Sequence, residues 1–100
     1  MATVRFEGRS GKEFAQFQSE VSQAVAASSA AAMMNCAWQD HTLHIQAPGA
    51  QGFVRLVGSR LLAEIRLSFP AILMKQKIVQ DIERVLSRVA DAPVATLEQD

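Results

Sequence analysis

The stretch that most constrains the fold is residues 34–69, where apolar and polar side chains alternate in short segments. Such alternation predicts strands with one buried face, because successive side chains of a strand point to opposite sides of the sheet. Turn-forming residues separate the segments, at 48–52 and again at 58–60. The stretch therefore predicts four strands of an antiparallel meander. The core-facing residues of its first two strands are Met34, Cys36, Trp38, Leu43, Ile45 and Ala47.

The first hairpin has a register that its side chains select. Pairing Trp38 with Leu43 places all six apolar residues on one face. A slip of one residue would place Trp38 opposite Thr42 and mix apolar with polar rows, so we reject it. The connecting loop is then residues 39–42 or their inner pair.

The last hairpin predicts a salt bridge as well as a register. A two-residue loop at 59–60 pairs Val54 with Ile65 on the core face. The same register places Arg55 opposite Glu64 on the other face, and it places Val57 opposite Leu62. Opposite charges directly across two strands stabilise a sheet by roughly 0.2–1 kcal/mol.

The segment before the meander predicts a strand and a helix. Val4 and Phe6 alternate with polar residues, which is typical of a short half-buried strand. Ser10 with Glu13 predicts a capping box, and a helix is expected over residues 11–31. Its apolar stripe comprises Phe14, Phe17, Val21, Ala24, Val25 and Ser28.

A second helix is expected over residues 70–90, since Pro70 is tolerated in a first helical turn. Leu73 and Val79 lie off its main stripe. The stripe comprises Met74, Ile78, Ile82, Val85, Leu86 and Val89.

The order β-α-β-β-β-β-α predicts a two-layer α+β sandwich, with both helices on one face of an antiparallel sheet. By analogy this is a reduced helix-grip fold. We expect a single domain over residues 1–91 and a flexible C-terminal tail over residues 92–100.

Composition excludes several classes of partner. Ten basic residues balance ten acidic ones, so the net charge does not favour binding to nucleic acid or to an anionic membrane. The single cysteine, Cys36, cannot form an internal disulfide and fits a reducing compartment. The start of the chain has no signal-peptide pattern, and the most apolar run, residues 24–38, is too interrupted to span a membrane. We therefore expect a cytoplasmic protein.

The polar residues predict no catalytic, cofactor or metal site. His41 lies in a turn, and His44 points away from the face assigned to Cys36, so three metal ligands do not converge. The predicted neighbours of Cys36 include no base, which favours a small buried hydrophobe over a nucleophile. Gly49 and Gly52 are not followed by a helix and form no phosphate loop.

Two surfaces remain as candidate sites. The first is the sheet face opposite the core, where apolar residues beside charges indicate an interface, unless they are merely scattered surface hydrophobes. Its residues are Phe53, Val57, Leu62, Arg55, Glu64 and Arg66. The second is a cavity between sheet and helices for a hydrophobic ligand, with a filled core as the alternative. Its lining would comprise Met34, Cys36, Trp38, Ile65, Met74 and Ile78. The pair Met33-Met34 and the alanine-rich end of the first helix could line the same cavity.

Several segments together resemble a bacterial family. The run Trp38-Gln-Asp-His-Thr-Leu43, the turn Pro48-Gly-Ala-Gln-Gly-Phe-Val54 and the strand at 61–69 are similar to those of the polyhydroxyalkanoic acid system, or granule-region, proteins. The closing helix fits with Ile78, Ile82, Glu83 and Leu86. The alanine-rich first helix and the acidic end of the chain depart from the pattern.

The resemblance implies an accessory or granule-associated protein and not an enzyme, and it carries over no functional residue. Our leading hypothesis is a homodimer that acts by interaction with a granule or a protein partner. The alternative is a small carrier of an acyl-type ligand.

Overall fold

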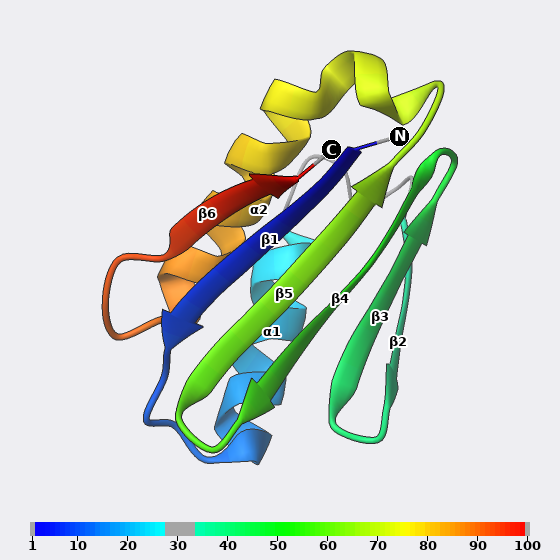
Figure 1. Ribbon diagram of the computed structural model, residues 1–100. Coiled ribbons are helices and arrows are strands. Elements are labelled where there is room, and N and C mark those ends of the chain that lie inside the picture. Colours follow the sequence, from blue (N-terminus) through cyan, green and yellow to red (C-terminus); the bar gives the residue numbers. More distant parts are fainter. Residues whose placement is uncertain (1, 28–33, 100) are drawn as a thin grey trace.

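The computed structural model describes residues 2–27 and 34–99 of the chain. Within them, one antiparallel sheet carries two helices on one of its faces (Figure 1). The helices are α1 (Phe14–Ala26) and α2 (Lys75–Val89), and the short 3-10 turn η2 (Ala71–Met74) precedes α2. The strands, in sheet order, are β2 (Asn35–Gln39), β3 (Thr42–Ala47), β4 (Ala50–Val57), β5 (Arg60–Leu67), β1 (Ala2–Arg9) and β6 (Ala95–Gln99). The predicted two-layer α+β sandwich is confirmed.

The first hairpin has the predicted register. Trp38 pairs with Leu43, and Cys36 pairs with Ile45. The loop is the inner pair Asp40 and His41, whose φ angles are 51° and 62°. Two successive residues with positive φ match the right-handed twist of the flanking strands, which is why such pairs join tight hairpins.

The register predicted for β4 and β5 is wrong by two residues. The turn is formed by Gly58 and Ser59, with Gly58 at a φ of 60°. Val54 therefore pairs with Ala63 instead of Ile65. A shift of two leaves every side chain on its predicted face, because the side-chain period of a strand is two.

Both neighbours of β1 come from distant parts of the sequence. β1 pairs with β5 on one side and with β6 on the other. The prediction of a flexible tail is wrong for Ala95–Gln99, since these residues form β6, an edge strand of the sheet.

The start of α1 also differs from the prediction. Glu13 occupies the N-cap position and makes no side-chain capping bond. Ser10 is fully buried, and its backbone N–H donates to the carbonyl of Ser59 at 2.9 Å, which joins the end of β1 to the β4–β5 turn. The predicted capping box is therefore wrong. The predicted continuation to Ala31, including Ser28, lies outside the described residues, as does Met33.

The orientation of α2 follows from the turn before it. A 3-10 turn has three residues per turn, so η2 shifts the phase of the chain relative to one continuous α-helix. Met74 is consequently exposed, although the sequence placed it on the stripe. Val79 is buried, although the sequence placed it off the stripe, because it shares one face of α2 with Leu86, about two helical turns further along. Leu86 and Val89 are buried as predicted.

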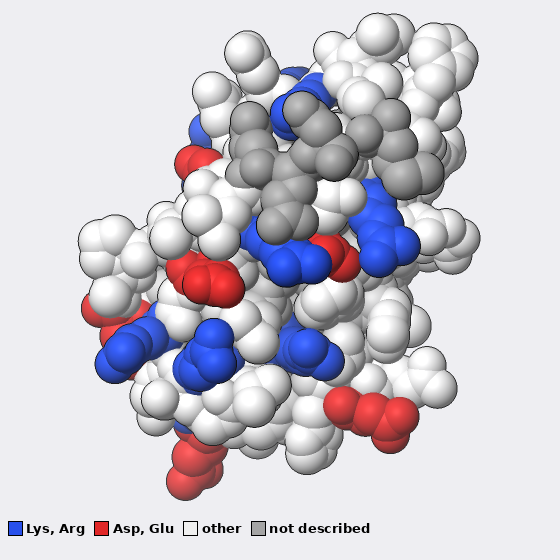
Figure 2. Space-filling view, in the orientation of Figure 1, with Lys and Arg blue, Asp and Glu red and all other residues white. Residues whose placement is uncertain are grey.

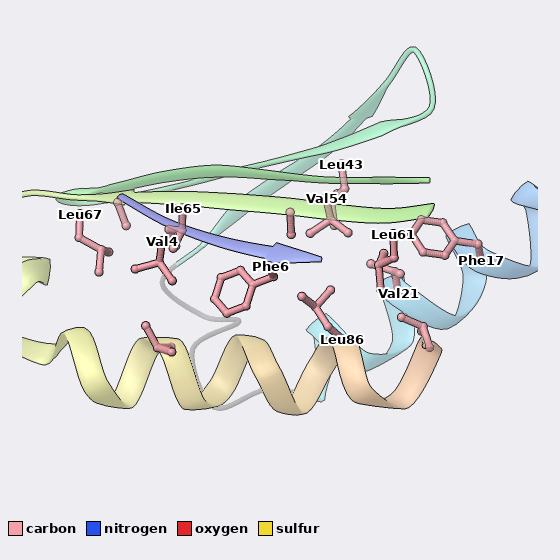
Figure 3. Packing of buried hydrophobic residues seen from close by; sticks show 14 residues of the cluster. Val4, Phe6, Phe17, Val21, Leu43, Val54, Leu61, Ile65, Leu67 and Leu86 are labelled. Carbon is pink, nitrogen blue, oxygen red and sulfur yellow. The ribbon is translucent and has the colours of Figure 1, made fainter. Parts of the chain in front are cut away.

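The core lies between the sheet and the helices (Figure 3). Val4, Phe6 and Ile65 point from the sheet toward the helices, and Leu86 points back from α2. Buried apolar area is the main stabilising contribution in a domain of this size. Neither of the described helices lies on the opposite face of the sheet (Figure 1).

Candidate interaction surface

The sheet face that the helices leave uncovered holds all six residues predicted for the interface. We call this surface the outer sheet face. The residues Phe53, Val57, Leu62, Arg55, Glu64 and Arg66 lie at alternate positions along β4 and β5, between the core-facing positions. Val57 is 53% exposed, whereas Phe53 and Leu62 are half-buried.

An ion-pair group lies at the centre of the outer sheet face. Arg5 Nε donates to Glu64 Oε1 at 3.1 Å, and Arg66 Nε lies 3.8 Å from Glu64 Oε2. The Glu64 side chain is only 14% exposed between them. The predicted Arg55–Glu64 pair is therefore wrong, and the cross-strand partner is Arg5, which lies opposite Glu64 on β1.

Arg55 contacts an aromatic ring instead. Its guanidinium carbon lies 5.1 Å from the centroid of the Phe53 ring, a cation–π arrangement. Arg55 also lies opposite Leu62, while Val57 lies opposite Arg60, so the predicted direct pairing of Val57 with Leu62 is wrong. Phe53 and Val57 are both diagonal neighbours of Leu62 across the strands, within reach of long side chains. Phe53, Val57 and Leu62 therefore still form an apolar group, but they lie diagonally across the two strands and not directly opposite one another.

Sequence reasoning missed one apolar member of this face. Leu97 of β6 lies opposite Arg5 and is 46% exposed. It was assigned to a tail because the segment 95–99 is short and has no neighbour in the sequence with which to pair. The single sequence feature that marks this strand is the isolated Leu97 between two polar residues.

Charges of both signs are interspersed over the strand side of the molecule (Figure 2). Figure 2 has the orientation of Figure 1, with the strands in front of the helices. Blue and red side chains touch in places and lie among white ones elsewhere, so this face carries both signs of charge. The arrangement favours a contact that combines apolar packing with salt bridges.

The six residues predicted to line a cavity do not come together. Cys36 is exposed on the edge strand β2, and Ile65 is buried on β5, from which β3 and β4 separate it. Met74 is 53% exposed on η2. Trp38 and Ile78 pack at the margin of the core cluster, and Met34 is half-buried before β2.

Cys36 is not the buried hydrophobe that the sequence predicted, because β2 is an edge strand and α1 covers Trp38 instead. Desolvation raises the pKa of the Cys36 thiol above its ordinary value even though the residue is exposed. A raised pKa keeps the thiol protonated and weakly nucleophilic at neutral pH.

Aromatic side chains attach the first hairpin to α1. The His41 ring stacks on Phe14 with centroids 4.1 Å apart, and Trp38 meets Phe14 edge-on at 5.7 Å. Trp38 Nε1 also donates to Ser22 Oγ at 3.0 Å. These contacts explain why Trp38 and His41 belong to the packing of the fold.

The described part of the chain contains no group of three His, Cys, Asp or Glu side chains that could hold a metal ion. An open depression lies along α2. Its lining comprises Gln80, Glu83, Arg84, Ser87 and Arg88.

Comparison with known proteins identifies the family. The model of a family described as "Putative polyhydroxyalkanoic acid system protein" matches residues 4–89. The chain belongs to this polyhydroxyalkanoic acid system family. The match spans the chain from β1 to α2 and leaves β6 outside it. The resemblance predicted from the sequence is thus confirmed for this polyhydroxyalkanoic acid system protein.

No curated protein matches the chain. Of the helices described, neither is long and apolar enough to cross a membrane.

Proposed function

We propose that this polyhydroxyalkanoic acid system protein is a non-enzymatic accessory protein of the cytoplasm that acts as a homodimer through its outer sheet face. Membership of the family supports a role in association with polyhydroxyalkanoate storage granules. The observation that carries the proposal is the apolar group of Phe53, Val57 and Leu62 on the sheet face opposite the two described helices.

The ionic group on this face supports a contact between identical copies. In a two-fold symmetric dimer each copy presents the same patch, so a patch that carries both signs of charge can complement itself. Glu64 is flanked by Arg5 and Arg66, and Arg60 lies beyond Leu62 on the same face of β5. The surplus of arginine around one glutamate leaves donors for acidic groups of the partner copy.

The alternative function, a carrier of an acyl-type ligand, has less support. It requires a hollow between sheet and helices lined by Ile65 and its neighbours. Ile65 is 5% exposed within the packed core cluster, and Cys36 and Met74 are exposed.

Leu62→Glu is expected to reduce the mass of the protein in sedimentation equilibrium from dimer to monomer. The added carboxylate would lose its water between two apolar surfaces. Loss of a central interface contact alone typically weakens binding by about 2 kcal/mol or more. The same variant should also lose co-sedimentation with purified polyhydroxyalkanoate granules, because the granule association is proposed for the dimer.

Gln80→Glu is the matched control, because it adds one negative charge on the exposed side of α2. It should keep the mass and the granule binding of the wild type. An unchanged mass for Leu62→Glu would contradict the proposed dimer, and failure of the wild type to sediment with granules would contradict the granule role.

A further inference from the structure

Two charged residues of β1 extend the outer sheet face beyond the ion-pair group around Glu64. Glu7 and Arg9 lie directly opposite Leu62 and Arg60 of β5. Glu7, Arg9 and Arg60 are exposed, and they alternate with the core-facing positions of their strands. We call these three residues the charged trio. In Figure 2 blue side chains lie across the lower part of this face, toward the end where Figure 1 shows the β4–β5 turn.

The charged trio differs from the group around Glu64 in having no ionic partner. Arg5 and Arg66 flank Glu64, whose side chain is only 14% exposed. Within the described part of the chain, no ion pair and no side-chain hydrogen bond involves a member of the trio. Glu7 is therefore the carboxylate of this face that remains available to a second copy of the chain.

The two arginines of the charged trio face each other across the strands. Arg9 and Arg60 form the last pair of the β1–β5 ladder, and directly opposite residues have Cβ atoms about 4.5–5.5 Å apart. Like charges in this arrangement destabilise a sheet. A carboxylate above the two guanidinium groups would accept their N–H groups and offset the repulsion. The pair therefore favours contact with an acidic side chain.

Leu62 lies between the carboxylate and the nearer arginine. Glu7 is directly across the strands from Leu62, about 5 Å away, and Arg60 is two residues along β5, about 7 Å away. In a face-to-face dimer the two-fold axis runs in the plane between the two sheets. An axis that passes at Leu62 and bisects these two directions exchanges the two positions. It would place Glu7 of each copy over Arg60 of the other copy.

We propose that Glu7 of each copy binds Arg60 of the partner copy across a two-fold axis at Leu62, with Arg9 beside the contact. This contact rests on the proposed homodimer, adds β1 to its interface and names the charges that orient the two copies. The symmetry repeats the contact, so it occurs twice in each dimer. The apolar group around Leu62 would supply affinity, whereas the paired charges would select the orientation and the partner.

A different axis shows why the charges select an orientation. An axis parallel to the strands and midway between β1 and β5 would place Arg9 of one copy over Arg60 of the other. Four guanidinium groups would then meet without a carboxylate between them, which is repulsive. Charge therefore favours the axis at Leu62 over this one.

Exchanging the two charges tests the proposal by sedimentation equilibrium. Glu7→Arg brings like charges together at both symmetry-related contacts, and so does Arg60→Glu. Each variant alone should raise the dimer dissociation constant at least about tenfold, because like charges across an interface repel. An equimolar mixture of the two variants should form a heterodimer whose dissociation constant is within about threefold of the wild-type value, because both contacts then join opposite charges.

Arg88→Glu is the matched control for Arg60→Glu, because it reverses the charge of an exposed arginine on α2. It should keep the wild-type dissociation constant. The urea midpoint of every variant is measured beside its mass. If a single variant has a lowered midpoint, the mixture still decides the question, because mixing restores opposite charges at the contacts and does not repair a misfolded chain.

Wild-type dissociation constants for both Glu7→Arg and Arg60→Glu would overturn the proposed contact, and dissociation of Leu62→Glu beside them would leave the homodimer standing. Loss of the dimer in both variants without a heterodimer in the mixture would also overturn the contact, because the two charges would then act within one copy. A monomeric wild type would overturn the homodimer itself and this contact with it.

Discussion

Gly52→Ala is expected to destabilise the protein by more than about 3 kcal/mol, among the largest effects of any single substitution in this chain. Gly52 lies in β4 between Ile45 of β3 and Ile65 of β5. A Cβ at this position would overlap the backbone carbonyl oxygen of Glu64 and lie 3.2 Å from the Ile65 Cα. Backbone atoms of a central strand cannot rotate aside, so β4 and β5 would have to separate.

The sign of this effect is informative. In an ordinary strand position, replacing glycine by alanine raises stability by roughly 0.5–1 kcal/mol, because the unfolded chain loses freedom. Urea unfolding monitored by the fluorescence of Trp38, the only tryptophan of the chain, measures the difference.

Gly8→Ala is the control for Gly52→Ala. A Cβ on Gly8 would lie 3.3 Å from Val94 Cγ2 and 3.6 Å from Leu61 Cδ2, both of them side-chain atoms that can adjust. We expect a change within about 1 kcal/mol for this variant. Equal urea midpoints for the two variants would show that β4 and β5 do not approach as closely as described.

Phe6→Ala is expected to lower the free energy of unfolding by about 3–5 kcal/mol. Phe6 is 1% exposed, and in Figure 3 its ring points from β1 toward α2, close to the Leu86 side chain. Its removal leaves a cavity between the two layers that the rigid sheet cannot close. The free energy of unfolding of a domain of this size is about 5–15 kcal/mol, so the substitution would remove a large part of it.

Phe69→Ala is the matched control for Phe6→Ala, since it removes the same side chain at a position that is 77% exposed. We expect its urea midpoint to change little, by the equivalent of about 0.5 kcal/mol. Similar losses for both variants would contradict the placement of β1 over α2.

The sequence was sufficient to predict which residues of β3, β4 and β5 face the core. It was insufficient to predict that Cys36 on the edge strand β2 is exposed, or how β4 and β5 align. Alternation has a period of two, so it cannot separate the predicted pairing of Val54 with Ile65 from the observed pairing with Ala63. The deciding residue is Gly58, whose φ of 60° places the turn one residue earlier than predicted. The pairing of strands that lie far apart in the sequence could not be predicted either. Arg5 is the partner of Glu64 because β1 lies beside β5, and no local sequence pattern indicates that these two strands are neighbours.

The candidate interface was predicted as a set of residues but not as an arrangement. All six predicted residues lie on the outer sheet face, because strand parity alone places them there. The contacts among them differ, since the register decides that Arg55 covers Phe53 and that Arg5 pairs with Glu64. The exposure of Met74 was not predicted, because residues 70–90 were assigned to one continuous helix, whereas η2 changes the phase of the chain.

Native mass spectrometry of the purified wild-type chain tests the central claim most directly, because it reports assembly and retained ligands together. A homodimer that acts through its outer sheet face predicts a species of twice the 10.9 kDa chain mass, with no small molecule bound. A monomer would contradict the account, and a monomer that retains a hydrophobic small molecule would establish the carrier function in its place.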